Sequence, residues 1–390
     1  MSNPLKKAFS GWRLFAAIAI GLSISAFMMY RSITETQFIK TKSGQGTHEW
    51  IDNNGDNKVD VYDPSEFKVS ENGSYTEQTF GAVLKTIDWN FGVIAWLLGA
   101  VLFTAGRDFF YMLRIRILTK NKLTWKASFY VILIWEFASA LSPGVVGGTA
   151  VAMFILNRET IPLGKATAIV IITAFMDNLF FVIMIPLVFL FIQNSDLFPS
   201  DVSSSLPLMW WFWIGCAVIF SICVLLYLTI FWYPKLATKF LLGIFSLPFL
   251  KRWKFIAREW GKDIETASKE FKQESRKFWL KVFFSTFGSW MCRYLVINAA
   301  LNAFLYLGFI DNIKILGKQL ILWLFMLVSP TPGGSGIAEF AFGELLSTFA
   351  ASTLLLGILA LIWRMISYFP YLFIGSIILP TWIKRTHRYK

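Results

Sequence analysis

The stretch Pro330-Thr331-Pro332-Gly333-Gly334-Ser335-Gly336 interrupts an apolar segment that runs from Gln319 to Phe349. A similar stretch, Ser142-Pro143-Gly144-Val145-Val146-Gly147-Gly148, interrupts the apolar segment 127–156. Proline removes a backbone donor and stops a helix, whereas glycine permits unusual backbone angles and close approach. Each apolar segment is therefore expected to form two half-helices that meet at a break.

The composition around these breaks is that of a membrane protein. Of the 390 residues, 56% are hydrophobic and 16% are charged, whereas a soluble domain is about 25% charged. This composition excludes a soluble enzyme, a disordered chain and a secreted disulfide scaffold, and it leaves a polytopic membrane protein. The three cysteines lie in apolar runs and show no disulfide or zinc spacing. The net charge of +13 comes from basic residues at the ends of apolar runs, where they anchor the chain on the cytoplasmic side.

Full membrane spans can be located because a spanning helix needs about 20 mostly apolar residues. Spans are expected at 12–30, 88–106, 166–192, 208–232, 278–307 and 353–378. Basic residues collect in the N-terminus, 107–126, 233–277 and the tail, and these segments are expected to be cytoplasmic. The acidic segment 31–86 and the loop 193–207 are expected outside.

These assignments agree with one another only if each broken segment starts and finishes on one side. Segment 127–157 would enter from the cytoplasm and segment 319–349 from outside, so both are expected to be re-entrant hairpins. A kinked full crossing is the alternative, but it would put one basic loop on the wrong side. The expected fold is an all-α polytopic membrane protein with about six full spans, two re-entrant hairpins and an inverted repeat. Both termini would be cytoplasmic.

The expected organisation has five parts. They are a first transmembrane helix (1–30), a small extracytoplasmic insertion (31–86), a first membrane half (87–232), a basic amphipathic segment (233–277) and a second membrane half (278–390). The basic amphipathic segment would lie on the anionic inner leaflet. No motif supports nucleic-acid binding, and the expected partners are membrane lipids with anionic headgroups. The oligomeric state is left open.

An inverted repeat places a substrate site near the membrane midplane, where the broken helices meet. The free N–H groups of a half-helix favour an anion, and a lipid phosphate is the obvious one. Ionisable residues within apolar segments are costly and usually functional. The alternatives are kinks or tight crossings through small residues, ion pairs that only hold helices together, and Glu339 as a helix cap. The candidate substrate-binding residues are Pro143, Gly144, Gly147, Gly148, Pro332, Gly333, Gly334, Gly336, Glu136, Asp177, Glu339, Arg293 and Arg364.

The stretch from Pro330 to Glu339 resembles the Pro-x-Pro-Gly-Gly-x-Gly-x-x-Glu signature of the lysylphosphatidylglycerol synthase transmembrane (flippase-like) family. The stretch 142–148 is similar to that family's first Pro-Gly-x-x-Gly motif, although Gly148 stands where the family usually has Glu. Asp177 and Arg364 match an Asp and a late-span Arg of the family. The resemblance covers most of the chain outside 31–86. It implies an inner-membrane protein that moves a phospholipid or polyprenyl-phosphate headgroup across the bilayer.

Family members with aminoacyl-transferase activity carry a large soluble catalytic domain. Because this chain ends at Lys390, that activity is not expected. A membrane enzyme acting on a lipid headgroup remains a second hypothesis, but neither His48 nor His387 belongs to a Ser/His/Asp or metal-ligand cluster. An ion or small-solute transporter is a third hypothesis, because the same architecture would serve it.

The insertion contains a segment with the ligand spacing of a calcium loop. The candidate ligands, at loop positions 1, 3, 5, 7, 9 and 12, are Asp52, Asn54, Asp56, Lys58 through its carbonyl, Asp60 and Asp63. The segment resembles the EF-hand-like loops of dockerins. A solvated turn rich in Asp and Asn is the alternative. Calcium, the only cofactor considered, would order this loop and would take no part in catalysis.

Overall fold

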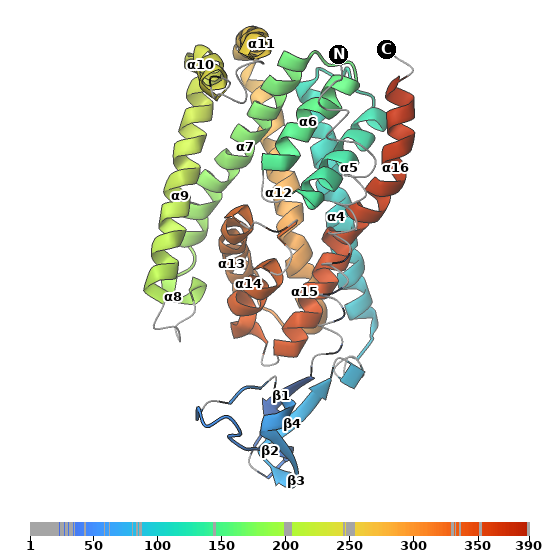
Figure 1. Cartoon of the computed structure of the whole chain (residues 1–390), viewed down its shortest axis with the longest axis vertical. Helices are drawn as coiled ribbons and strands as arrows, with labels where there is room; N and C mark the ends of the chain where they lie inside the picture. Colours follow the sequence, from blue (N-terminus) through green and yellow to red (C-terminus); the bar gives the residue numbers. More distant parts are fainter. Residues whose placement is uncertain are drawn as a thin grey trace.

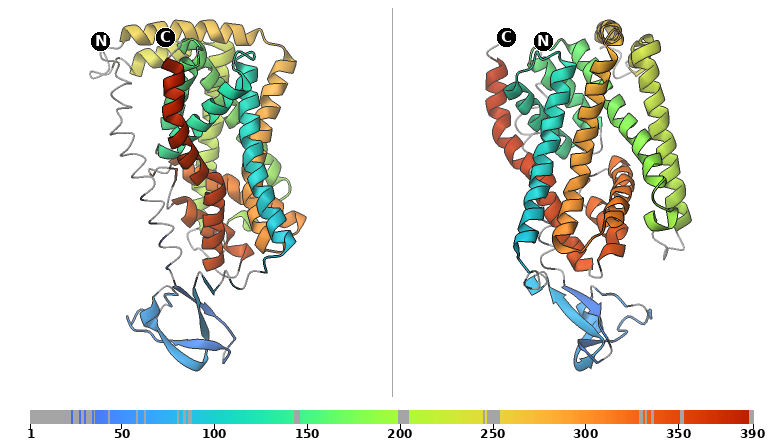
Figure 2. Two further views of the ribbon diagram at one scale, coloured as in Figure 1. Left: turned by 90° about the vertical axis from the view of Figure 1, so that its right-hand side faces the viewer. Right: turned by 180° about the vertical axis from the view of Figure 1, so that it is seen from behind.

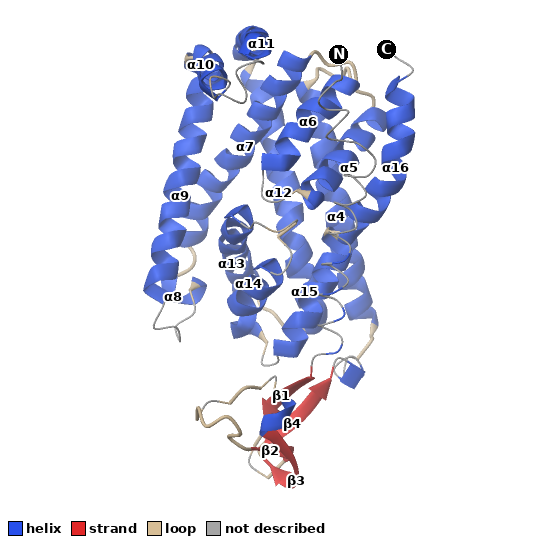
Figure 3. Ribbon diagram, viewed as in Figure 1, coloured by secondary structure: helices blue, strands red, loops and turns tan. Residues whose placement is uncertain are grey.

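A computed structural model gives the structure of the chain. It describes residues 36–198 except 43, 58, 62, 80, 83–84, 86–87 and 143–145, then 205–244, 246, 254–328, 331, 333–334, 337–350 and 353–387, together with residues 23, 27, 30 and 34. The expected first span, 12–30, therefore lies almost entirely outside the described residues. The described part is a helical bundle with a small sheet at one end (Figure 1, Figure 3).

The first part of the bundle consists of α4 (Phe91–Leu118), α5 (Trp125–Leu141), α6 (Val146–Arg158), α7 (Leu163–Phe189), the short α8 (Asn194–Leu197), and α9 (Ser205–Tyr227) with its π-helical extension η2 (Leu228–Trp232). The second part consists of α12 (Arg276–Phe304), α13 (Phe309–Val328), α14 (Ile337–Leu346), the 3-10 turn η4 (Ser347–Phe349), α15 (Thr353–Ser367) and α16 (Phe369–His387). Among the described residues, four stretches are long and apolar enough to cross a membrane: Phe91–Leu118, Leu163–Phe189, Met209–Trp232 and Leu355–Thr386. The chain is thus a mainly helical membrane protein, as its composition predicts.

Both expected breaks separate two helices. α5 ends at Leu141 and α6 begins at Val146, while α13 ends at Val328 and α14 begins at Ile337. α5 and α6 lie together in the half of the bundle where α16 ends, and α13 and α14 lie together in the opposite half (Figure 1). The two breaks therefore approach the middle of the bundle from opposite ends.

Small residues let the two central helices, α4 and α12, pack closely. A Cβ on Gly288 of α12 would lie 2.8 Å from the ring of Phe110 on α4. A Cβ on Gly106 of α4 would lie 3.1 Å from Cys292 Sγ on α12. Close approach through small residues is a common way for membrane helices to associate. It brings the polar side chains of both helices to the same depth.

Two helices lie across the end of the bundle at which α16 ends: α10 (Lys235–Ile244) and α11 (Lys254–Lys272) (Figure 2). Phe271 of α11 is fully buried. Glu270 accepts hydrogen bonds from Lys165 of α7 at 2.8 Å and forms an ion pair with Lys120 at 3.0 Å. The bond from Lys165 is the main reason that the pKa of Glu270 lies below its usual range. Phe271 is therefore packed against the protein, and contact of this segment with the inner leaflet stays a prediction.

The insertion folds as a four-stranded antiparallel sheet, which the sequence analysis did not predict. Its strands are β1 (Thr36–Lys40), β2 (Gly46–Trp50), β3 (Phe67–Gly73) and β4 (Tyr75–Thr79), in the order β1-β4-β2-β3, and the 3-10 turn η1 (Pro64–Glu66) precedes β3. The rings of Phe38 and Phe67 stack with their centroids 4.0 Å apart and form the small core of the sheet. The sheet lies at the end of the molecule opposite α10 and α11 (Figure 2).

Candidate functional site

A cavity of about 340 Å³ lies in the middle of the bundle, between the two breaks. Ser142 of the first break and Gly333 and Gly334 of the second break line it. The ionisable side chains of its wall, among the described residues, are Arg107, Arg114, Arg293, Arg364, Glu136 and Asp177, together with tyrosines. Counting arginines and carboxylates, the formal charge of this wall is 4 − 2 = +2.

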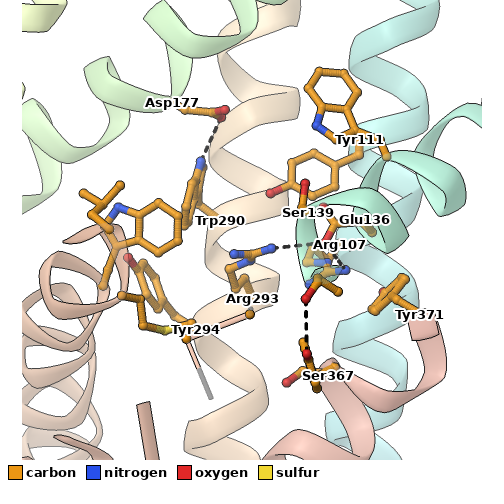
Figure 4. A pocket seen from close by; sticks show the side chains of 18 of the residues that line it. Arg107, Tyr111, Glu136, Ser139, Asp177, Trp290, Arg293, Tyr294, Ser367 and Tyr371 are labelled. Carbon is orange, nitrogen blue, oxygen red and sulfur yellow. Dashed lines mark hydrogen bonds and ion pairs between the residues drawn. The ribbon is translucent and has the colours of Figure 1, made fainter. Parts of the chain in front are cut away.

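Glu136 of α5 joins two arginines from different helices (Figure 4). Its Oε2 accepts hydrogen bonds from Arg107 Nη2 of α4 at 3.2 Å and from Arg293 Nη2 of α12 at 3.4 Å. Arg107 is only 3% exposed and also donates to Asp108, whose other oxygen accepts from Tyr371 Oη at 2.8 Å. A charge at this depth needs such partners. Glu136 therefore fixes the first hairpin to the two central helices.

Asp177 of α7 makes a second interhelical pair on the same cavity. Its Oδ1 accepts from Arg114 Nη1 of α4 at 2.6 Å and from Trp290 Nε1 of α12 at 2.9 Å. Figure 4 shows Trp290 directed at this carboxylate. α7 is thereby joined to both central helices.

Arg364 of α15 holds both sides of the second break. Its Nε donates to Glu339 Oε1 at the start of α14, at 2.8 Å, and its Nη1 donates to the carbonyl of Gly333, at 3.0 Å. Gly333 has φ +58° and Gly334 has φ +70°, a region that favours glycine. One arginine therefore fixes the shape of the turn and the position of the half-helix after it.

Tyr368 connects the two breaks. Its Oη donates to the carbonyl of Ala140, near the end of α5, at 3.2 Å. Its ring covers Gly333, since a Cβ on that residue would lie 2.2 Å from the ring. The side chain of Tyr368 therefore contacts both the end of α5, before the first break, and Gly333 of the second break.

Two nitrogens of arginines that line the cavity have no hydrogen-bond partner among the described residues. They are Nε of Arg293 and Nη2 of Arg364, and both atoms are buried. Buried polar groups in proteins are nearly always paired, so unused donors at a cavity need an explanation. The guanidinium of Arg293 also lies over the rings of Trp290 and Trp323, at 5.1 and 5.8 Å from their centroids. The cavity thus offers cationic donors next to aromatic surface.

The structure brings most of the described candidate residues together. Glu136, Asp177, Arg293, Arg364, Gly333 and Gly334 line the cavity. Glu339 reaches it through Arg364, and Gly147 and Gly148 belong to the first turn of α6. Gly148 packs against Ser139, where a Cβ would lie 2.2 Å from the hydroxyl oxygen. Pro143, Gly144, Pro332 and Gly336 lie outside the described residues.

The sequence analysis was wrong about Arg107 and Arg114, which it assigned to a cytoplasmic basic segment after a helix ending near residue 106. α4 continues to Leu118, and both arginines are buried, with exposed fractions of 3% and 6%. Their spacing with Tyr111 was a usable signal, because positions 107, 111 and 114 share one helix face. The aromatic residues Trp290, Tyr294 and Tyr371 were also missed, since aromatic side chains are frequent all along this chain.

The calcium-like loop is organised by hydrogen bonds within the protein. Asp52 accepts from the N–H groups of Gly55 and Asn57, and Asp63 accepts from Ser65 N. The carboxylate of Glu66, 1% exposed, accepts from Asn54 Nδ2 and from Asp60 N. Asn57 has φ +54°, a left-handed conformation that Asn adopts more readily than most residues. Asp56 is described as a loop residue, Lys58 lies outside the described residues, and in the described part no group of three or more His, Cys, Asp or Glu is arranged to hold a metal.

Comparison with known proteins identifies relatives that match most of the chain. A family model described as the lysylphosphatidylglycerol synthase TM region matches residues 78–375. A UPF0104 membrane protein of Archaeoglobus fulgidus is 26% identical over 322 residues, which is 78% of this chain and 90% of that protein. No solved structure matches the chain.

Proposed function

This chain belongs to the family of the lysylphosphatidylglycerol synthase TM region, and on that premise we propose that it transports a lipid. The headgroup of a phospholipid or polyprenyl phosphate would cross the membrane through the central cavity, by flippase or scramblase action. The observation that carries this proposal is the cavity between the two breaks, with a wall of formal charge +2 and two unused arginine donors. Ionisable side chains at this depth in the membrane are energetically costly and usually have a function.

The proposed orientation in the membrane follows from the location of the basic segments at one end of the bundle. With the basic segments in the cytoplasm, the α5–α6 hairpin enters from the cytoplasmic side and the α13–α14 hairpin from outside. Both termini are then cytoplasmic, the sheet of residues 36–79 is extracytoplasmic, and the membrane is the inner one. Irregular backbone at the breaks is acceptable in the membrane because it borders a polar cavity.

The arginine pairs suggest how an anion could bind and leave again. Each of the four cavity arginines already has a carboxylate from a neighbouring helix, so its positive charge is partly compensated before an anion binds. A phosphate would accept hydrogen bonds from the unused Nε of Arg293 and Nη2 of Arg364. Because the carboxylates compete for the same guanidinium groups, binding would stay weak enough for release.

The alternatives share the fold but not the ligand. An ion or small-solute transporter would use the same charged cavity without needing a lipid. An enzyme acting on a lipid headgroup would need an activated nucleophile or a metal at the cavity. The described residues of the wall form neither a Ser/His/Asp arrangement nor a metal-ligand cluster. We favour transport of a lipid because the cavity combines charged donors with an extensive aromatic lining, including Trp290, Trp323 and Trp363.

Reconstitution in vesicles tests the proposal. Vesicles of phosphatidylcholine containing a fluorescent phosphatidylglycerol are prepared with wild type, with Arg364→Gln and with the surface control Lys269→Gln. We expect wild type and the control to expose the labelled headgroup to an external quencher at least tenfold faster than protein-free vesicles, and Arg364→Gln to do so at least tenfold more slowly than wild type. If wild type moves no lipid but carries a labelled inorganic anion, the solute-transporter alternative is correct.

A further inference from the structure

The cavity is charged on one side and apolar on the other. Its arginines come from α4, α12 and α15. Among the described residues, α9 and α13 contribute one polar side chain, Gln319, and otherwise Ile219, Leu322, Trp323, Met326 and Leu327. A ligand that fills the whole cavity would therefore be polar at one end and apolar at the other.

On the apolar side, a single helix separates the cavity from the surroundings. α9 buries Phe212, Ile219 and Cys223, which recur at helical spacing, and Ile219 reaches the cavity wall. The other face of α9 exposes apolar side chains, namely Val218, Phe220, Ile222 and Leu225, to 41–57%. α9 lies at the edge of the bundle in two views (Figure 1, Figure 2). In a bilayer, one side of α9 would thus contact lipid chains and the other side the cavity.

The contact between α9 and α13 is narrow. Gly215 lies against Leu324, because a Cβ at Gly215 would be 3.2 Å from Cδ2 of that leucine. Lys318–Leu322 of α13 are all buried, whereas Trp323–Leu327, more than one helical turn, are all partly exposed. The end of α13 that leads into the second break is therefore partly exposed along more than one turn, next to the apolar wall of the cavity.

We infer that the hydrocarbon chains of the substrate leave the cavity through the seam between α9 and α13, past Ile219 and the Gly215–Leu324 contact. The arginines would hold the headgroup, the first part of the chains would lie against the apolar wall, and the rest of the chains would stay in the bilayer. The inference rests on the proposed function and deepens it, since it assigns the apolar wall to acyl or prenyl chains. A free phosphate would need no such seam.

Cross-linking the seam tests this inference. Cys216, Cys223 and Cys292 are replaced by alanine, and Gly215→Cys and Leu324→Cys are introduced for a short, reducible bifunctional thiol reagent. In the vesicle assay with fluorescent phosphatidylglycerol, we expect cross-linking to slow lipid movement at least tenfold and reduction to restore it. The matched control pair, Phe189→Cys and Phe212→Cys, joins α9 to α7, where the two native rings lie 5.8 Å apart, and its cross-link should change the rate less than twofold.

Three results would decide against the inference. Unchanged lipid movement in the cross-linked seam, together with loss of movement in Arg364→Gln, overturns the seam but leaves the proposed function intact. Labelled glycerol phosphate has no hydrocarbon chains, so a cross-link that slows its transport as strongly as lipid movement overturns the inference as well. Absence of lipid movement in wild type removes the proposed function and the seam with it. If the cysteine variants do not fold, Ile219→Trp replaces them, and it should slow lipid movement at least threefold without changing thermal stabilisation by glycerol phosphate.

Discussion

The two breaks look alike in sequence but are held in different ways. In the first, Glu136 lies before the break and binds arginines of α4 and α12, while the corner itself relies on the close contact of Gly148 with Ser139. In the second, Glu339 lies after the break, and Arg364 binds both this carboxylate and the carbonyl of Gly333. The first corner is thus fixed mainly by shape and the second by charge.

Because the two corners are held differently, substitutions at them are expected to reduce stability to different extents. Breaking a buried ion pair leaves an uncompensated charge, which costs more than a steric mismatch that a neighbour can relieve. Variants at the second break are therefore expected to be more severe than variants at the first.

The largest effect is expected for Arg364→Gln. It removes a partner of Glu339 and the donor to Gly333, and loss of one member of a buried pair costs about 3–5 kcal/mol. Thermal unfolding in detergent measures this loss. Arg364→Gln with Glu339→Gln should recover part of the stability but none of the lipid transport. Full stability in Arg364→Gln would show that the second corner does not depend on charge.

Glu136→Gln should have the next largest effect, about 3 kcal/mol, at the lower end of the range for a broken buried pair. Arg107 keeps Asp108 as a partner, whereas Arg293 loses the carboxylate that it shares in this structure. The variant should also bind glycerol phosphate more tightly, because the competing carboxylate is gone. Calorimetric titration measures this affinity, and a weaker affinity would contradict the competition between carboxylate and phosphate.

Gly333→Ala should cost about 1–3 kcal/mol, the usual penalty for overpacking. The added methyl group meets the ring of Tyr368, and the positive φ disfavours alanine. Gly343→Ala in α14 is the matched control, since nothing lies within 4 Å of its Cβ. In a helix interior that change should stabilise the protein by about 0.5–1 kcal/mol. Equal unfolding temperatures for the two variants would argue against the strained corner.

Gly148→Ala should be milder, with a cost of about 1 kcal/mol. The added methyl meets the hydroxyl of Ser139, but this side chain can rotate. Ser139→Gly in the same chain should restore the unfolding temperature, because it removes both the hydroxyl and the Cβ. Failure of this rescue would show that the first corner is not limited by this contact.

The smallest effect is expected for calcium at the loop 52–63, which stays a proposal from the ligand spacing. Calcium should slow proteolysis of the insertion, and a chelator should reverse this, without any change in lipid movement. Magnesium at the same concentration is the control. Equal protection after Asp52→Ala would remove the calcium proposal, because that carboxylate occupies the first ligand position.

Much of the candidate site could be predicted from the sequence because ionisable residues within apolar segments are rare and easy to recognise. Glu136, Asp177, Arg293 and Arg364 were all found in this way, and all line one cavity. Arg107 and Arg114 were missed because a basic run after an apolar one also fits a cytoplasmic anchor. Only the observed length of α4, which continues to Leu118, distinguishes buried arginines from a cytoplasmic anchor. The sheet of residues 36–79 was missed because its short strands carry many polar residues and bury only a small core.

The sequence alone determined that the chain enters a membrane, because the free energy of burying long apolar runs does not depend on their partners. It also determined where two of its helices break, since proline and glycine act on the local backbone. Only the tertiary structure decided which charges meet. Glu136 binds residues 29 and 157 positions away, and Tyr368 reaches a carbonyl 228 positions away. Such pairings depend on how helices pack, and no local pattern encodes them.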